Sequence, residues 1–138
     1  MATRETIRHI IEKYRNIAVY GMSKDPGKTA YWVPQYLAKK GYDITPVNPT
    51  GEVILKRKSY PDLKSVPKRI DVVLVFRRSE DALEPVKEAV ARKKERGDIS
   101  VVWLQQGIRN EEARKLAEEN EIVFVQDRCM YHEYRMIY

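Results

Sequence analysis

The chain has 138 residues, 43% hydrophobic and 33% charged, with a net charge of +6 at pH 7. This length predicts one domain with a single core, and no apolar run approaches the ~20 residues of a membrane span. The sequence opens without the apolar segment of an export signal, and its one cysteine, Cys129, cannot form an internal disulfide. We therefore expect a cytoplasmic protein. Abundant Lys, Arg and Glu with scarce Gln and Asn hint at a thermophilic source.

Apolar runs typical of strands alternate with helical periodicity along the whole chain, which predicts a parallel sheet with crossover helices. Pro46 removes a ladder hydrogen bond from its strand and favours an edge position. The expected elements, in chain order, are a helix over about 3–15, a strand at 17–20, a glycine loop at 21–29, a helix that ends at Gly41, a strand at 43–47, an irregular connection at 48–67, a strand at 70–76, a helix at 79–97, a strand at 99–104, a helix capped by Asn110, a strand at 122–126 and a short helix in the tail.

Five parallel strands with right-handed crossovers predict an α/β fold with a doubly wound, Rossmann-like sheet and helices on both faces. We expect the strand order 3-2-1-4-5, in which the winding reverses between strands one and four. In such sheets the ligand lies beyond the carboxyl ends of the strands near that reversal. The segments that should meet there are 21–29, 48–49, 76–78, 105–107 and 127–129.

The loop after the first strand is the most informative segment. Gly21 to Thr29 has the pattern of a phosphate cradle, because a strand that breaks at a glycine and leads into a helix directs backbone N–H groups at one point. It is not a P-loop, since five residues rather than four separate Gly21 from Gly27. Ser23 also stands where the dinucleotide fingerprint has its second glycine. The pattern predicts a phosphate site of another type.

Cations near the same edge favour a ligand with several phosphates. They are Lys28 in the loop and Arg77 and Arg78 after the third strand; the alternative interpretation is a surface lysine and a solvated strand end. NAD is disfavoured because strand two ends at Asn48 and Pro49 rather than at the carboxylate that bonds a ribose. Asn48 can still bond a hydroxyl group.

The net positive charge does not by itself indicate a nucleic-acid-binding protein. The basic residues are dispersed, and aromatic residues do not recur beside them as a base-stacking surface requires. Nucleic acid is therefore not the expected partner. The densest basic cluster, Arg92-Lys93-Lys94, alternates with glutamates and is interpreted as a solvated helix face.

A series of short motifs occurs in order at the strand ends. They are Gly21-x-Ser23-x-x-x-Gly27-Lys28, Gly41-Tyr42, Pro46-Val47-Asn48-Pro49, Tyr60-Pro61-x-Leu63, Val75-Phe76-Arg77, Trp103-Leu104-Gln105-x-Gly107 and Asp127-Arg128-Cys129. Together they resemble the stand-alone coenzyme A-binding proteins, small relatives of the amino-terminal domain of the succinyl-CoA synthetase alpha subunit. The resemblance covers nearly all of the chain after the first helix.

The resemblance implies that residues 1–138 form a single domain that binds coenzyme A or a CoA thioester. It places the pyrophosphate at Gly21, Ser23 and Lys28. It also places Asn48 and Pro49 near the adenosine half, and Phe76 and Arg77 along the cofactor. Met22, Thr29, Gly107 and Cys129 complete the candidate set. Tyr31 and Trp32 either add aromatic contacts or pack the helix.

No catalytic pattern accompanies these motifs. The only histidines, His9 and His132, are interpreted as surface residues, and the sequence contains no Ser-His-Asp order, cysteine pair or carboxylate cluster. We therefore expect a binding protein without turnover or metal. The alternatives are a detached subunit of an acyl-CoA ligase with a partner chain, and a module for NAD or ATP. A homo-oligomer through the aromatic tail is left open.

Cys129 is the residue that could add chemistry. It follows the last strand at the binding edge, and the neighbouring Arg128 favours a thiolate. We hypothesise a mixed disulfide between Cys129 and a thiol ligand such as coenzyme A. The alternative is a small buried residue at a strand end.

Overall fold

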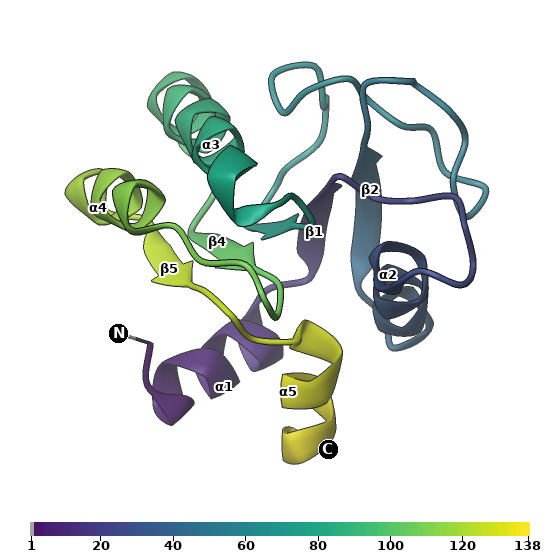
Figure 1. Cartoon of the computed structure of the whole chain (residues 1–138), viewed down its shortest axis with the longest axis horizontal. Helices are drawn as coiled ribbons and strands as arrows, with labels where there is room; N and C mark the ends of the chain where they lie inside the picture. The colour runs from purple at the N-terminus through teal and green to yellow at the C-terminus, as the bar shows by residue number, and fades with distance from the viewer. Residues whose placement is uncertain (1) are drawn as a thin grey trace.

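The chain folds into a five-stranded parallel sheet between two layers of helices (Figure 1). The computed structural model describes residues 2–138. In chain order the elements are α1 (Arg4–Lys13), β1 (Asn16–Tyr20), α2 (Thr29–Lys39), β2 (Asp43–Val47), β3 (Val72–Val75), the 3-10 turn η1 (Ser79–Asp81), α3 (Leu83–Arg96), β4 (Val101–Leu104), α4 (Glu111–Glu119), β5 (Val123–Val125) and α5 (Met130–Ile137).

The strand order is β2-β1-β3-β4-β5, which confirms the doubly wound α/β class and corrects the expected order 3-2-1-4-5. β3 pairs with β1 instead of lying outside β2. Its four residues are all fully buried, which suits an interior strand. Pro46 places β2 at the edge, as expected. The winding therefore reverses between β1 and β3, not between the first and fourth strands.

Each face of the sheet has its own apolar layer. On one face α1, α2 and α5 pack against β-strand side chains, and this layer contains Ile11, Leu37 and Trp103. On the other face α3 and α4 pack over Val73 and Val102. Burial on both faces explains why the strands read as continuous apolar runs.

The helix ends follow the sequence signals. The side chains of Thr3 and Asn110 accept N–H bonds in the first turns of α1 and α4. Gly41 follows Lys40, the C-terminal flanking residue of α2, with φ 98°. Pro85 lies in the first turn of α3, where a missing N–H costs nothing.

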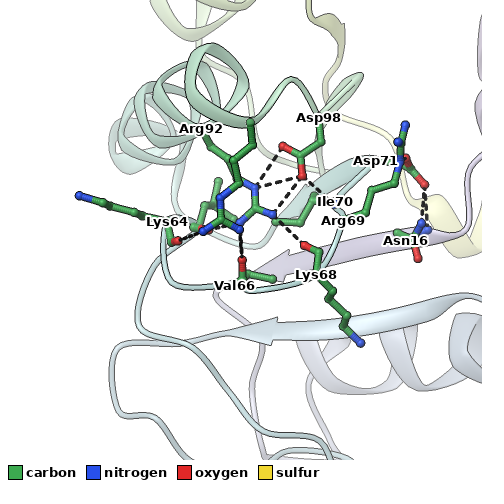
Figure 2. Close-up of polar contacts among 11 residues, drawn as sticks. Asn16, Lys64, Val66, Lys68, Arg69, Ile70, Asp71, Arg92 and Asp98 are labelled. Atoms are coloured by element: carbon green, nitrogen blue, oxygen red, sulfur yellow. Dashed lines mark hydrogen bonds and ion pairs between the residues drawn. The ribbon is translucent and has the colours of Figure 1, made fainter.

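Arg92 is buried, which corrects the interpretation of its cluster as a solvated helix face. The residue is 4% exposed, and its guanidinium bonds the Asp98 carboxylate with Nη2 to Oδ2 at 3.0 Å. It also donates to the carbonyl oxygens of Leu63, Val66 and Lys68 (Figure 2). Arg92 of α3 thus holds the connection between β2 and β3 against this helix through hydrogen bonds. Periodicity could not reveal this, because the connection that covers Arg92 has none.

We predict that Arg92→Ala lowers the free energy of unfolding by about 3–5 kcal/mol, because Asp98 is left buried without its counter-ion. Arg8→Ala is the control. It removes an exposed pair with Glu12, and such pairs contribute less than about 1 kcal/mol. Denaturant unfolding measures both losses. Equal small losses would show that the buried network does not hold the connection.

Candidate functional site

The carboxyl ends of the strands bring the candidate segments to one edge of the sheet. The residues that directly follow β1 to β5 are Gly21, Asn48, Phe76, Gln105 and Gln126. Since all strands are parallel, these positions lie side by side in the strand order. A ligand near the reversal between β1 and β3 would meet the segments that follow both strands.

Gly21 closes the first turn of the glycine loop against the end of β3. Its φ is 87°, and a Cβ atom at this position would lie 2.5 Å from the carbonyl oxygen of Phe76. Its N–H donates to the carbonyl oxygen of Val47 at 2.9 Å. This N–H is therefore occupied, and the placement of the pyrophosphate at Gly21 stays a prediction that does not use this donor. The residue is needed for close packing.

Hydrogen bonds within the glycine loop and to the start of α2 hold the rest of the loop in place. The N–H of Ser23 donates to the carbonyl oxygen of Ala30 at 3.2 Å, and the Ser23 hydroxyl oxygen accepts from the N–H of Asp25 at 3.0 Å. The Asp25 carboxylate accepts from the N–H of Gly27 at 3.0 Å. These bonds fix the loop without a ligand, so its donors do not converge as they would in a P-loop.

The start of α2 keeps unpaired donors. Within residues 2–138, no acceptor contacts the N–H groups of Thr29 and Ala30. Lys28 precedes them as the N-terminal flanking residue, makes no capping bond with its exposed side chain, and no acidic residue lies in the first turn. α1 and α4 have both a capping side chain and acidic residues there. The helix dipole, these two N–H groups and a lysine make the start of α2 a candidate anion site, called the anion site below.

Met22 and Asn48 are two candidate residues whose side chains make contacts within the protein. The side chain of Met22 is fully buried in the layer under α2, so only its main chain can reach a ligand. Asn48 donates from Nδ2 to the carbonyl oxygen of Met22 at 2.8 Å, and its Oδ1 accepts from the N–H and hydroxyl of Thr50. The side chain of Met22 is therefore closed to a ligand, whereas Asn48 keeps a second Nδ2 hydrogen and its contact with a ligand stays a prediction. Pro49 beside them is exposed.

The connection after β2 lies against the glycine loop. Lys24 and Glu52 pair across the two segments, with Nζ to Oε2 at 3.2 Å. Tyr60 continues the edge of β2 through bonds with Pro46 and Asn48. The irregular connection therefore contacts the glycine loop at Lys24 and extends the edge of β2.

Arg77 occupies a different position from Arg78. Its guanidinium lies 5.3 Å from the ring centre of Tyr20, and its buried Nε has no acceptor within the described chain. Burial and a hydrogen bond to Glu88 raise the pKa of Tyr20. Tyr20 and Arg77 border a depression of about 460 Å³ at the start of α3. Arg78 is exposed and pairs with Asp81, so it is a surface ion pair. Half-buried Phe76 packs toward α2 and α5.

A groove of about 540 Å³ lies between the start of α2, the end of β4 and the start of α5. Two candidate residues, Thr29 and Cys129, line it together with Trp32 and Gln105. The Trp32 ring also packs edge-on against Tyr131 at 5.1 Å, so this residue both packs the helix and borders the site. Because Thr29 belongs to the anion site as well, the groove begins where that site ends.

Gly107 is tied to the loop after β5. Its N–H donates to Oδ1 of Asp127 at 2.7 Å, and Arg109 donates to Oδ2 at 3.1 Å. These two contacts lower the pKa of Asp127. The N–H of Gly107 is thus occupied. Asp127 therefore connects the loop after β5 to the loop after β4, which contains Gly107 and Arg109. The sequence had indicated only that Asp127 lies at this edge of the sheet.

Comparisons with known proteins identify the family. Residues 15–135 match the family described as CoA binding domain. The chain belongs to this family. It is 36% identical to "Uncharacterized protein YneT" of Bacillus subtilis over 93% of this chain and 91% of that protein. It is also 29% identical to the ADP-forming acetate–CoA ligase II of Archaeoglobus fulgidus, over 75% of this chain and 15% of the ligase.

Solved structures agree with the fold of this CoA-binding domain. A hypothetical protein from Pyrococcus horikoshii superposes with a TM-score of 0.90 and 39% identity over 97% of this chain and 91% of that chain. The dinucleotide-forming acetyl-coenzyme A synthetase 1 of Ca. Korarchaeum cryptofilum superposes with a TM-score of 0.71 and 23% identity over 86% of this chain and 27% of the synthetase. At that identity the second likeness supports the fold alone.

Two features are absent from residues 2–138. No helix there is long and apolar enough to cross a bilayer. No group of three or more His, Cys, Asp or Glu side chains is arranged to hold a metal ion in the same part of the chain.

We predict that Gly21→Ala destabilises the domain by about 2–5 kcal/mol, the sum of a left-handed backbone with a Cβ and of an overpacked contact. Gly27→Ala in the same loop is the matched control. Its φ is not positive and its nearest atom, Asp25 Oδ1, lies at 3.4 Å, so the expected loss is under about 1 kcal/mol. Denaturant unfolding compares the two. Similar losses would contradict the close approach to Phe76.

Proposed function

We propose that the protein binds coenzyme A or a CoA thioester, with the pyrophosphate at the start of α2, and releases its ligand without turnover. The observation that carries this proposal is the pair of unpaired N–H groups at Thr29 and Ala30 beside Lys28, in a chain of the CoA-binding family. A pyrophosphate supplies the acceptors and the negative charge that this helix end lacks. CoA is the cofactor whose family this sequence matches.

The proposed ligand path runs along the carboxyl edge. With the pyrophosphate at Thr29, one half of the ligand extends toward Pro49 and the connection that Lys24 and Glu52 hold against the glycine loop. The other half extends into the groove that Thr29 shares with Cys129. Phosphate and sulfur ends are thus separated along one continuous surface. Coenzyme A has a pantetheine arm that can enter the groove, whereas ATP has no such group.

A second candidate function is that of a detached CoA-binding subunit of an acyl-CoA ligase. It is favoured by the match to 15% of the Archaeoglobus fulgidus ligase, whose remaining length this chain does not cover. That function requires a partner chain with the rest of the ligase machinery. Purification of the protein from its source, with or without an associated chain, separates the two functions.

We predict that CoA raises the melting temperature more than ATP or NAD at equal concentration. A ligand at a hundredfold excess over its Kd stabilises the fold by about 2.7 kcal/mol. ATP shares the phosphates but lacks the arm for the groove, and NAD lacks a carboxylate partner for its ribose after β2. Differential scanning fluorimetry ranks the three ligands. A shift with ATP or NAD and none with CoA would overturn the proposal.

We predict that Lys28→Ala weakens CoA binding about five- to tenfold, because a charge-assisted contact with the pyrophosphate is lost. Lys39→Ala is the control, since Lys39 is exposed at the opposite end of the same helix. Isothermal titration calorimetry measures both affinities, and unfolding curves check that both variants fold. Equal affinities of the two variants for CoA would show that the pyrophosphate does not bind at the start of α2.

A further inference from the structure

Arg77 carries hydrogen-bond donors that the protein does not use. Its Nε is the only buried side-chain nitrogen or oxygen atom in residues 2–138 that has no hydrogen-bond partner. Every other arginine in this part of the chain, apart from the exposed Arg4, donates at least one side-chain hydrogen bond. A buried donor without an acceptor is unfavourable, so this exception needs a physical reason.

The guanidinium of Arg77 lies against an aromatic ring that is itself held in place. It is 5.3 Å from the ring centre of Tyr20, which is 7% exposed and whose hydroxyl donates to Glu88 of α3. On its other side, the Cδ of Arg77 lies 3.6 Å from the position that a Cβ on residue 21 would take. Packing and a cation–π contact therefore position the arginine without using its N–H groups.

Arg77 lines the depression of about 460 Å³ at the start of α3. This depression and the groove beside α2 lie on opposite faces of the sheet (Figure 1). Tyr20 and Leu83 of the depression belong to the apolar layer under α3 and α4. Trp32 and Cys129 of the groove belong to the layer under α1, α2 and α5. The two hollows can therefore hold different molecules.

The charges around the depression favour a ligand group with one negative charge. Two of its three acidic residues pair with Arg78, which leaves Arg77 and Lys87 with a single unpaired acid, Glu84. The acidic side chains repel a phosphate dianion more strongly than a monoanion. Nε and a terminal nitrogen of an arginine also present two parallel N–H groups, which match the two oxygens of a carboxylate.

We propose that this depression is a second binding site, separate from the CoA site, and that it takes a small monocarboxylate with a short apolar body. The carboxylate accepts from a terminal nitrogen of Arg77, and a small rotation of the side chain brings Nε to the second oxygen. Leu83 and Pro85 line the depression and contact the apolar body. The site goes beyond the proposed function and does not depend on it.

The test is a titration of the isotope-labelled protein with propionate, followed in proton–nitrogen correlation spectra at constant ionic strength. The signal of the Arg77 Nε–H group is identified by its loss in Arg77→Lys. Propionate should shift this signal to a plateau, whereas propionamide, which has the same size and no charge, should leave it in place. A shift that is absent, that does not saturate or that chloride reproduces would overturn the proposal. A plateau reached at lower concentration with inorganic phosphate would overturn the carboxylate assignment.

Three variants test the groups that select the ligand, with the backbone N–H signal of Leu83 as the readout and unfolding curves as the check of folding. Arg77→Lys keeps the charge but loses the paired donors, so propionate should bind at least about tenfold more weakly. Glu84→Gln removes the unpaired acid and should strengthen binding about twofold. Arg78→Lys is the control and should bind as the wild-type protein does, because Arg78 pairs with Asp81. Equal affinities of Arg77→Lys and the wild-type protein would contradict the site.

A titration with propionate at saturating CoA separates this site from the proposed function. A full shift of the Arg77 signal with CoA bound supports two separate sites. Loss of the shift when CoA binds would place Arg77 in the CoA site, as the family resemblance implies, and would overturn the second site. If calorimetry detects no CoA binding while propionate still shifts the signal, the proposed function fails and the second site stands.

Discussion

The arrangement of the candidate site depends on the contact between Gly21 and the end of β3. The carbonyl oxygen of Phe76 occupies the space of a Cβ on residue 21, so only glycine lets the first loop leave β1 at this angle. Gly21 also bonds Val47 at the end of β2. One residue without a side chain thus joins the ends of three adjacent strands. The direction of the glycine loop, and therefore of α2, follows from that junction.

Because of this contact, some N–H groups of the glycine loop bond other parts of the protein, and others stay available to a ligand. Once Gly21 and Ser23 donate to the carbonyl oxygens of Val47 and Ala30, the N–H groups without an acceptor in residues 2–138 are those of Met22 and Lys24 in the loop and of Thr29 and Ala30 in α2. The protein thus satisfies its own backbone where the chain bends and leaves the helix end open. At the opposite edge of the sheet, Arg92 satisfies the carbonyl groups of another irregular connection. Both connections are ordered by hydrogen bonds together with buried apolar side chains, Met22 in the first and Leu63 and Val66 in the second.

The sequence predicted the class of fold because that class depends on local signals. Alternating apolar runs, the Asn110 cap and Gly41 each report on their own segment. Strand order depends on which buried strand pairs with which, and the pattern of β3 fits any interior position. The edge of the sheet where the candidate residues lie could be predicted for the same reason as the fold. The sequence could not predict which N–H groups are free, because that depends on contacts such as those from Gly21 and Ser23 to the carbonyl oxygens of Val47 and Ala30. Gln105 and Arg92 differ from their exposed neighbours only in what packs over them.

Two parts of the fold meet at the groove beside α2. The start of α2 offers a lysine and two N–H groups without an acceptor in residues 2–138. The opposite side of the groove is held to the sheet, because the Trp103 indole donates to the carbonyl oxygen of Arg128 and Gln105 accepts from the N–H of Met130. Thr29 belongs to the first part and borders the groove as well. A ligand with a phosphate at α2 would therefore have its remaining groups directed along a groove whose walls the sheet holds in place.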